Sequence, residues 1–561
     1  MPSYGGSNVR ADAAAGLTVA VMLVPQAMAY AMLAGLPPVV GLYAATLPLF
    51  AYALFGTSRQ LAVGPVAMVS LMVASGVGAL ATPGSAEYIA LAALLALMVG
   101  VLQVAMGTLR LGFVVNFLSR PVISGFTAAA AVIIALSQLK HLLGVAIPRG
   151  LPHETLAAAI DLLPQTNGPT LLIGLLAIGM LLGLRKVAPR APGALIVVVL
   201  TTLLTRWLDL RAVGVSVVGD VPAGLPALHV PELTTQMLLD LAPSALAISL
   251  VGFVGAISVA RVFATKHNYR IDANSELIGL GIANLASGFV GGYAVTGGFA
   301  RSAVNDQAGA RTPMAAMVTG AAMLIALAWL TGLFADLPTA TLAAIIMVAV
   351  TRLVDPAEVA HLWRVKRADL AMMAVTFFAT LGVGVQEGIA TGVGLSMLWF
   401  VTARTRPNYA VLGRLPGTTV YRNVKNYPEA TTHEGVLALR FDAAIYYGNV
   451  SFLLETLQRE EAAMASPLRE VVLDASGVND LDSSAARALQ QLTRDYRDRN
   501  VTLRFAAVKR PVMEVMHKTG LVDDVSSCNF FHTVADAISA TDAVERPSAG
   551  PNVVPLAAIV T

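Results

Sequence analysis

The sequence predicts an α-helical polytopic membrane protein that ends in a soluble α/β domain. The chain has 561 residues, of which 56% are hydrophobic and 13% charged, and its mean hydropathy is +0.71. A soluble protein of this size has too little interior to bury so much apolar surface. Apolar runs recur between residues 12 and 403, and many approach the roughly 20 residues that cross a bilayer as a helix. After residue 404 charged residues become frequent and apolar runs shorten to strand length, which indicates a separate domain.

The membrane part, residues 1–404, contains fourteen apolar segments. They are 12–34, 38–55, 65–80, 88–109, 121–139, 170–184, 191–207, 241–260, 274–290, 298–309, 313–333, 337–351, 369–385 and 388–403. Two of them, 65–80 and 298–309, are too short to span the bilayer. Each of these two follows a Gly-containing stretch, "FGTSRQLAVGP" and "GGYAVTGG".

Lysine and arginine in the connecting loops set the orientation, because cytoplasmic loops carry an excess of both. With a cytoplasmic N-terminus, 17 of these residues fall on the cytoplasmic side, including Arg190, and four on the other side. The four are Lys140, Arg149, Arg206 and Arg211. The even number of segments then places the C-terminal domain in the cytoplasm as well, so we expect a multi-pass protein of the cell (inner or plasma) membrane.

The segments repeat in two halves of seven, about 12–207 and 241–403. The first and eighth segments begin 229 residues apart, and the short third and tenth begin 233 residues apart. Because seven is odd, the two halves run through the membrane in opposite directions. Short, Gly/Pro-interrupted segments at matching positions of inverted halves indicate the binding site of a secondary transporter.

The two short segments predict an anion site at mid-membrane depth. A helix that begins inside the membrane directs unpaired N–H groups and the positive end of its dipole at one place. The first of these helices begins after Pro65, and the second begins around Gly297–Phe299. Arg301, one turn into the second, adds a full positive charge. The alternative is that Arg301 pairs with a carboxylate such as Asp306, or reaches the membrane surface.

The first segment is interrupted by Pro25, which removes a helical hydrogen bond and kinks the helix. Gln26 and Tyr30 lie one turn apart and therefore share a face. Two interpretations stay open. Gln26 offers donors to a substrate oxygen, or the kink is structural and Gln26 binds a neighbouring helix.

Two long stretches carry a resemblance to a known family. They are "VPQAMAYAMLAGLPPVVGLYAATLPLFAYALFGTSRQLAVGPVAMVSLMV" (24–73) and "ANLASGFVGGYAVTGGFARSAVNDQAGARTP" (283–313). They resemble the two signatures of the SulP sulfate-permease family of anion transporters. The cytoplasmic part resembles the STAS domain (sulfate transporter and anti-sigma-factor antagonist) attached to these permeases.

The resemblance implies a membrane domain split into a core and a gate domain, a homodimer, and alternating access by an elevator-like motion. It implies sulfate, bicarbonate, chloride, oxalate or dicarboxylates as substrates, held between the third and tenth segments beside the first and eighth. Carried onto this chain, it gives these substrate-binding residues: Gln26, Tyr30, Val66, Ala67, Gly298, Phe299, Ala300 and Arg301.

The eighth segment departs from the family pattern at Gly255, where many relatives have a glutamate. In proton-coupled members the proton on that carboxylate offsets the charge of the anion. The other acids are expected outside mid-span: Asp272 and Glu276 in the first turn of segment nine, and Glu387 in a loop. With Gly255 at the coupling position, proton symport is in doubt, and exchange, uniport or coupling through another group gains weight.

The C-terminal part is predicted to comprise a linker at 405–415, an α/β domain at 416–545 and a flexible tail at 546–561. Strand patterns at 435–441, 469–476 and 501–507 alternate with helical patterns at 450–463, 484–498, 511–519 and 533–541. The domain could bind a cytoplasmic partner or help the permease to dimerise. Its "DLDSS" (480–484) resembles a phosphorylated loop of anti-sigma-factor antagonists. Helix capping by Asp482 or Ser483 explains it more simply.

The sequence predicts a transporter and not an enzyme. No Ser/His/Asp set converges at one depth, the eight His show no metal-ligand spacing, and no phosphate-binding G-x-x-x-x-G-K-[ST] motif occurs. We therefore expect no metal, cofactor or nucleic acid, and we expect small anions and membrane lipid as partners. The alternatives are an anion channel or voltage-responsive protein, a neutral-substrate carrier of the nucleobase type, and a sensor that signals through its STAS domain.

Overall fold

The computed structural model of the protein describes residues 6–113, 119–148, 150–188, 192–222, 224–226, 228 and 234–545. The predicted flexible tail 546–561 and the loop residues Arg149 and Arg190 lie outside the described residues. The chain divides into two compact units, Met1–Ser396 and Met397–Thr561.

The first unit is almost entirely helical. Its α-helices are α1 (Gly6–Leu33), α2 (Pro38–Tyr43), α3 (Leu47–Phe55), α4 (Ala67–Gly78), α5 (Ala86–Thr108), α6 (Arg120–Leu143), α7 (Pro152–Asp161), α8 (Gly168–Val187), α9 (Gly193–Trp207), α10 (Thr235–Lys266), α11 (Ala273–Phe289), α12 (Phe299–Gln307), α13 (Met314–Ile325), α14 (Thr339–Val350), α15 (Pro356–Val365), α16 (Arg367–Gly382) and α17 (Val385–Thr405). Two short strands, β1 (Val63–Gly64) and β2 (Thr296–Gly297), pair with each other. Short turns of 3₁₀ or π helix, η2 to η5, are Leu163–Gln165, Ala326–Leu330, Thr331–Phe334 and Thr351–Leu353.

Each of the fourteen predicted segments overlaps helical structure, and seven described stretches are long and apolar enough to cross a membrane. The predicted apolar segment 38–55 is one of these seven stretches, and it consists of two consecutive helices. The chain forms α2 and α3, because Pro48 at the start of α3 cannot supply the N–H of a continuing helix. None of the predicted segments includes α7 or α15, and each of these helices begins with a proline. Glu387 lies in the first turn of α17, not in a loop.

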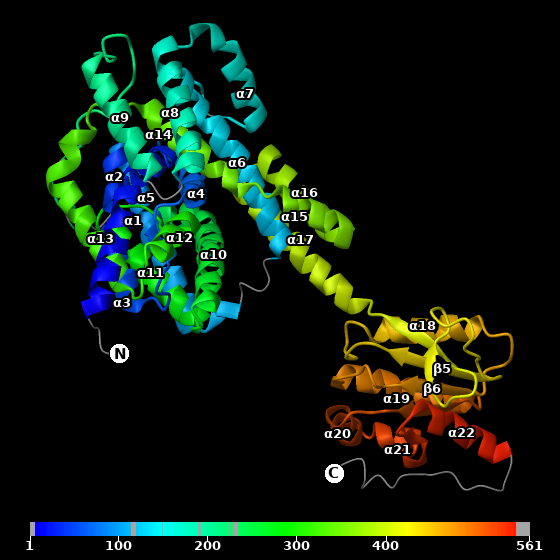
Figure 1. Ribbon diagram of the computed structural model, residues 1–561. Coiled ribbons are helices and arrows are strands. Elements are labelled where there is room, and N and C mark those ends of the chain that lie inside the picture. The colour runs from blue at the N-terminus through cyan, green and yellow to red at the C-terminus, as the bar shows by residue number, and fades with distance from the viewer. Residues whose placement is uncertain are drawn as a thin grey trace. The chain divides into compact units, whose positions relative to one another are not determined.

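The helices of the first unit pack as two groups. Helix group 1 comprises α1–α5 and α10–α13, in which α11 packs on α5 and α3, and α1 packs on α13. In Figure 1 the green α10–α12 lie beside the blue α1–α5, although the two sets are far apart in sequence. Helix group 2 comprises α6–α9 and α14–α17, in which α14 packs on α6 and α8, and α16 packs on α6.

A buried carboxylate fixes the chain that leads from α3 into β1. Asp272 caps α11 by accepting a bond from the Ser275 N–H at 2.7 Å, as predicted. Glu276 does more than occupy the first turn. It is fully buried and accepts bonds from the Tyr52 hydroxyl at 2.8 Å and the Thr57 N–H at 2.6 Å. The charge is thus satisfied by donors from the first repeat, and it holds the entry to β1 in place.

The second unit is an α/β domain. Its strands are β3 (Tyr409–Arg414), β4 (Tyr421–Asn423), β5 (Val436–Phe441), β6 (Glu470–Asp474), β7 (Thr502–Ala506) and β8 (Phe530–Phe531), in the sheet order β4-β3-β5-β6-β7-β8. Its helices are α18 (Val450–Ala462), α19 (Ser483–Asp498), α20 (Arg510–Thr519), α21 (Leu521–Val525) and α22 (Val534–Glu545), with a 3₁₀ turn, η6, at Ser527–Asn529. Side chains of α18–α21 pack in one apolar core with the sheet, and α22 packs in a second.

The alternating strands and helices predicted for this domain are confirmed, whereas β3, β4, β8 and α21 were not predicted. The predicted linker 405–415 contains β3, which pairs antiparallel with β5 through Tyr409 and Phe441. The short run "YAVLGR" forms this strand by pairing with β5, which begins only at residue 436. Asp482 caps α19 by accepting a bond from the Ala485 N–H at 2.7 Å, which confirms the simpler interpretation of "DLDSS".

Candidate anion site between two half-helices

The two short predicted segments meet in the structure. β1 and β2 form an antiparallel pair in which Val63 lies opposite Gly297 and Gly64 lies opposite Thr296. α4 and α12 begin within three residues of these strands, and Figure 1 shows α4 and α12 close to each other. Because the strands run antiparallel, the helices leave the pair in opposite directions and their N-terminal ends face the same region. The N–H groups of residues 67–69 and 299–301 precede the first intrahelical bonds of these helices.

Hydrogen bonds between the two repeats hold this crossing together. The Gly298 N–H donates to the Ala62 carbonyl at 3.1 Å, and the Ala62 N–H donates to the Ser302 hydroxyl at 2.9 Å. The Asn305 amide donates to the Gln60 carbonyl at 3.1 Å. Gly298 was predicted to bind substrate, but its N–H is already engaged by Ala62. The Gly298 N–H is therefore not among the donors that the start of α12 leaves without an intrahelical bond.

A second set of bonds fixes β2 from the side of α10 and α11. Asn284 of α11 both donates to the Val295 carbonyl at 3.0 Å and accepts from the Val295 N–H at 2.8 Å. The Thr296 hydroxyl donates to the Gly252 carbonyl of α10 at 2.7 Å. Sequence reasoning missed both residues. The sequence signal for Asn284 and Thr296 was a polar side chain within an apolar stretch. In such a stretch the N–H and C=O groups of an irregular backbone must find hydrogen-bond partners within the protein.

Arg301 lies inside this crossing and is only 2% exposed. Its Nη1 donates to the Pro65 carbonyl at the start of the opposite half-helix, at 2.6 Å. Its Nε and Nη2 are buried and have no hydrogen-bond partner within the described part of the chain. Two glycines leave space for the guanidinium. A Cβ added at Gly298 would lie 2.9 Å from the Arg301 Nη2, and a Cβ added at Gly64 would lie 3.4 Å from the same atom. The arginine thus folds back over the start of its own helix.

The alternative that Arg301 pairs with Asp306 is wrong. Asp306 lies at the other end of α12 and accepts a bond from Lys266 Nζ at 2.6 Å. It also lies 2.5 Å from His267 Nε2. Asp306 is therefore neutralised by the end of α10. The two unpaired nitrogens of a buried cation are the kind of group that an anion satisfies, because an uncompensated buried charge is costly.

The first segment lies against the same crossing. α1 packs on both α4 and α12, and its Leu23 side chain lies 3.6 Å from the Cβ position of Gly64. Gln26 and Tyr30, on this helix, are 9% and 7% exposed. Phe299, the first residue of α12, is 60% exposed and stacks on Phe263 of α10. Its backbone N–H is one of those that precede the first intrahelical bond of α12.

Gly255 lies on the part of α10 that faces the start of α4. A Cβ at this position would meet only the Met68 Cε, at 4.0 Å. Met68 is the second residue of α4, so a longer side chain at 255 has space beside the half-helix start. The predicted coupling position is therefore next to the candidate site, and it carries no titratable group.

We expect Gly298→Ala to weaken anion binding roughly tenfold to a hundredfold. The backbone of Gly298 (φ −104°, ψ 122°) suits alanine, so the change acts through its methyl group alone. That methyl group would displace the Arg301 guanidinium, and a hydrogen bond to a charged group is worth about 1.5–3 kcal/mol. Titration of the purified protein with labelled anion measures the effect. Gly168→Ala, where a Cβ meets no atom within 4 Å, is the matched control, and an equal loss there would contradict the assignment.

Comparison with known sequences places these elements in a family. The profile described as the Sulfate permease family matches residues 9–376, which include both half-helices, and the STAS domain profile matches residues 427–537. The chain is 39% identical over 548 residues to sulfate transporter 4.1, chloroplastic, of Arabidopsis thaliana, covering 94% of this chain and 79% of the relative. It is 34% identical over 536 residues to a probable sulfate transporter of Mycobacterium tuberculosis, covering 95% of both chains.

Solved structures of anion transporters have the same fold. The murine Slc26a9 anion transporter in the inward-facing state matches with a TM-score of 0.90 and 26% identity, over 97% of this chain and 93% of that one. The transmembrane domain of the cyanobacterial bicarbonate transporter BicA matches with a TM-score of 0.60 and 26% identity, over 70% of this chain and 97% of that one. These relatives and neighbours are transporters, not enzymes.

Proposed function

Because the chain belongs to the sulfate permease family and ends in a STAS domain, we propose that it is a secondary transporter of small anions. The observation that carries the proposal is the pair of unpartnered nitrogens on buried Arg301, between the N-terminal ends of α4 and α12. A full positive charge and two positive helix ends act together at a place where Arg301 is only 2% exposed. An anion is the ligand that this arrangement favours most.

In the proposed site, the anion lies against Arg301 and the first N–H groups of each half-helix. Val66 and Ala67 contribute from α4, and Phe299 and Ala300 contribute from α12. Gln26 and Tyr30 of α1 offer further donors on the facing side. Sulfate, bicarbonate, chloride and dicarboxylates fit such a set of donors, and the named relatives transport anions of this kind.

We propose that helix group 1 carries the anion across the membrane by an elevator-like motion against helix group 2. Fourteen segments then cross or enter the bilayer, both termini are cytoplasmic, and two copies form a dimer in the cell membrane. Because Gly255 supplies no carboxylate, the transporter works without proton symport, by exchange or uniport. The STAS domain binds a cytoplasmic partner in this proposal.

The test is uptake of labelled sulfate, bicarbonate, chloride and dicarboxylates into proteoliposomes, with and without a pH gradient. We expect saturable uptake of at least one anion, stimulated by unlabelled anion on the opposite side and indifferent to the gradient. Ohmic single-channel currents would favour the anion channel instead. Uptake driven by acidification despite Gly255 would contradict the proposed coupling.

A neutral-substrate carrier on the same scaffold is the second candidate, and the charge at the site argues against it. A neutral ligand would leave the two nitrogens of Arg301 without a countercharge in a buried place. Competition between labelled anion and a neutral nucleobase in the same proteoliposomes separates the two functions.

A further inference from the structure

Helix α15 (Pro356–Val365) is tied at both ends to segments of the membrane unit. The turn η5 and two further residues join it to α14, and Lys366 alone joins it to α16. Its ten residues cover about 15 Å at 1.5 Å per residue, which is about half the thickness of the hydrocarbon core. α15 packs on α16, and Figure 1 shows the two helices side by side. Because α14 and α16 cross or enter the bilayer in the proposed function, the short α15 between them lies along its surface.

α15 carries an exposed apolar face. Val359 and Trp363 lie one turn apart and therefore share a face, and they are 40% and 63% exposed. Leu362, which is only 6% exposed, marks the side on which the helix packs against the protein. His361 and Arg364 occupy the remaining side, which is polar and exposed. A short helix with this division lies in the interface between the membrane and water, where tryptophan is enriched.

Two arginines stand beside this apolar face, at the C-terminal end of α15. Arg364 Nε donates to a carbonyl of its own helix at 3.2 Å, which leaves its two Nη groups directed to other partners. The Arg367 guanidinium carbon lies 5.9 Å from the centre of the Trp363 ring. The nearby ion pair joins Lys366 to Asp369 at 4.0 Å. Neither arginine forms an ion pair with a carboxylate in the described part of the chain.

An anionic phospholipid presents both kinds of group that this surface fits. A guanidinium binds a phosphate through two parallel N–H donors, and acyl chains cover the apolar face. A free phosphate would leave Val359 and Trp363 in water, and an uncharged lipid would leave the two arginines without a countercharge. The acids of α15, Asp355 and Glu358, lie in its N-terminal turn and therefore do not oppose a phosphate at the other end.

We propose that α15 anchors the protein to anionic phospholipid on the cytoplasmic surface of the membrane. Val359 and Trp363 lie among the upper parts of the acyl chains, and Arg364 and Arg367 bind the phosphate of the headgroup. The anchor belongs to helix group 2. Its consequence for transport rests on the proposed function, in which helix group 1 moves against helix group 2. A fixed position at the membrane surface is what the stationary group requires.

Quenching of Trp363 fluorescence by brominated lipid tests this proposal in the full-length chain. The three other tryptophans are replaced, as Trp207→Phe, Trp329→Phe and Trp399→Phe, and the protein is placed in phosphatidylcholine vesicles. Part of the lipid is then exchanged for phosphatidylglycerol or phosphatidylcholine that carries bromine at the same acyl carbons. We expect brominated phosphatidylglycerol to quench Trp363 at a concentration roughly fivefold lower than brominated phosphatidylcholine, because basic residues attract anionic lipid.

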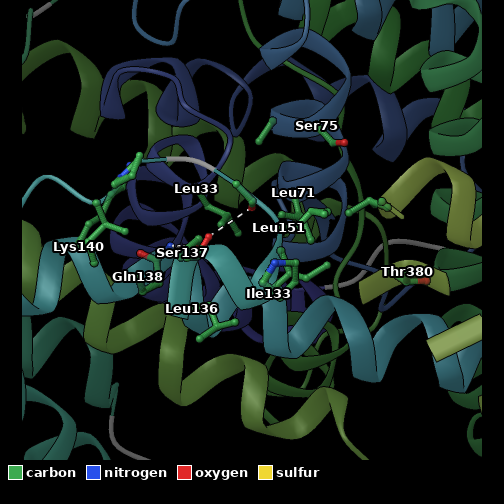
Figure 2. Close-up of a pocket in the computed structure, with 18 of the residues that line it drawn as sticks. Leu33, Leu71, Ser75, Ile133, Leu136, Ser137, Gln138, Lys140, Leu151 and Thr380 are labelled. Atoms are coloured by element: carbon green, nitrogen blue, oxygen red, sulfur yellow. Dashed lines mark hydrogen bonds between the residues drawn. The ribbon is translucent and has the colours of Figure 1, made fainter. Parts of the chain in front are cut away.

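Substitution of the two arginines separates the headgroup contact from the apolar contact. Arg364→Gln with Arg367→Gln should make the two brominated lipids equally effective, whereas the corresponding pair of lysine substitutions should keep most of the preference. The matched control, Lys140→Gln with Arg206→Gln, removes the same number of charges elsewhere. Lys140 lines a separate cavity (Figure 2) that contains no residue of α15, and Arg206 is exposed in the last turn of α9. This control should keep the full preference.

Three results would overturn the proposal. The first is equal quenching by the two brominated lipids in the parent protein. The second is an equal loss of preference in the arginine pair and in the control pair. The third is quenching of Trp363 by aqueous iodide but by neither lipid, which would place this face in water or against a protein surface. Both leaflets contain the brominated lipid and no transport is measured, so the outcome is independent of the proposed topology and of the transported anion.

Discussion

Arg301→Gln should weaken anion binding roughly a hundredfold or more while the protein stays folded. Truncating one partner of a buried, hydrogen-bonded charge pair costs about 2–5 kcal/mol, which corresponds to this range of affinity. Arg301→Lys should fall between the wild type and the glutamine variant, because it keeps the charge but loses the planar guanidinium that reaches Pro65 and the ligand together.

Equilibrium binding of labelled anion to purified protein and counter-flow in proteoliposomes measure the Arg301 effect. Arg59→Gln is the matched control, since Arg59 is exposed and lies over the Tyr269 ring, away from the half-helix starts. Undiminished transport in Arg301→Gln would refute the anion site and favour the neutral-substrate carrier.

Gly255→Glu should make transport depend on pH, whereas the wild type should show no dependence on a proton gradient. An ionised carboxylate at 255, on the part of α10 that faces the start of α4, would repel the anion from the half-helix start, so uptake should be slow at pH 7.5. Protonation removes that repulsion, so uptake should rise as the pH falls. A repulsion of about 1.4 kcal/mol suffices for a tenfold change in rate, so at least a tenfold change is expected.

Uptake at pH 5.5 and 7.5, with and without an inward proton gradient, measures the Gly255 effect. Gly255→Gln is the control of equal size that cannot titrate. It should transport at a rate independent of pH, because a side chain at 255 has only the Met68 Cε within 4 Å of its Cβ. If the glutamine variant is inactive, the position is sterically closed and the electrostatic interpretation fails.

The apolar segments and the two breaks could be read from the sequence because each leaves a local signal. A run of about twenty apolar residues predicts a helix that crosses the membrane. Pro65 and the glycines before Phe299 interrupt such runs at matching places of the two halves. The alternation of strands and helices in the second unit is equally local, so its strands at 436–441, 470–474 and 502–506 were found within a few residues.

The partners of polar groups could not be read, because they come from distant parts of the chain. Asp306 shares the short helix α12 with Arg301, but it binds Lys266 and His267 at the end of α10. Ser302 meets Ala62 across 240 residues of sequence. Strand β3 was missed for the same reason, since "YAVLGR" becomes a strand through its pairing with β5 and β4.

By itself the sequence determined that this chain is a polytopic membrane protein, that two short helices follow breaks at matching places of its two halves, and that Arg301 lies in the first turn of one of them. Hydropathy and glycine or proline placement are properties of short stretches, so no tertiary information was needed. Only the tertiary structure decided that Arg301 reaches across to Pro65 and keeps two nitrogens unpaired, and that Gly255 faces Met68. These outcomes depend on which groups the two repeats bring within hydrogen-bonding distance, and no stretch of either repeat contains that information.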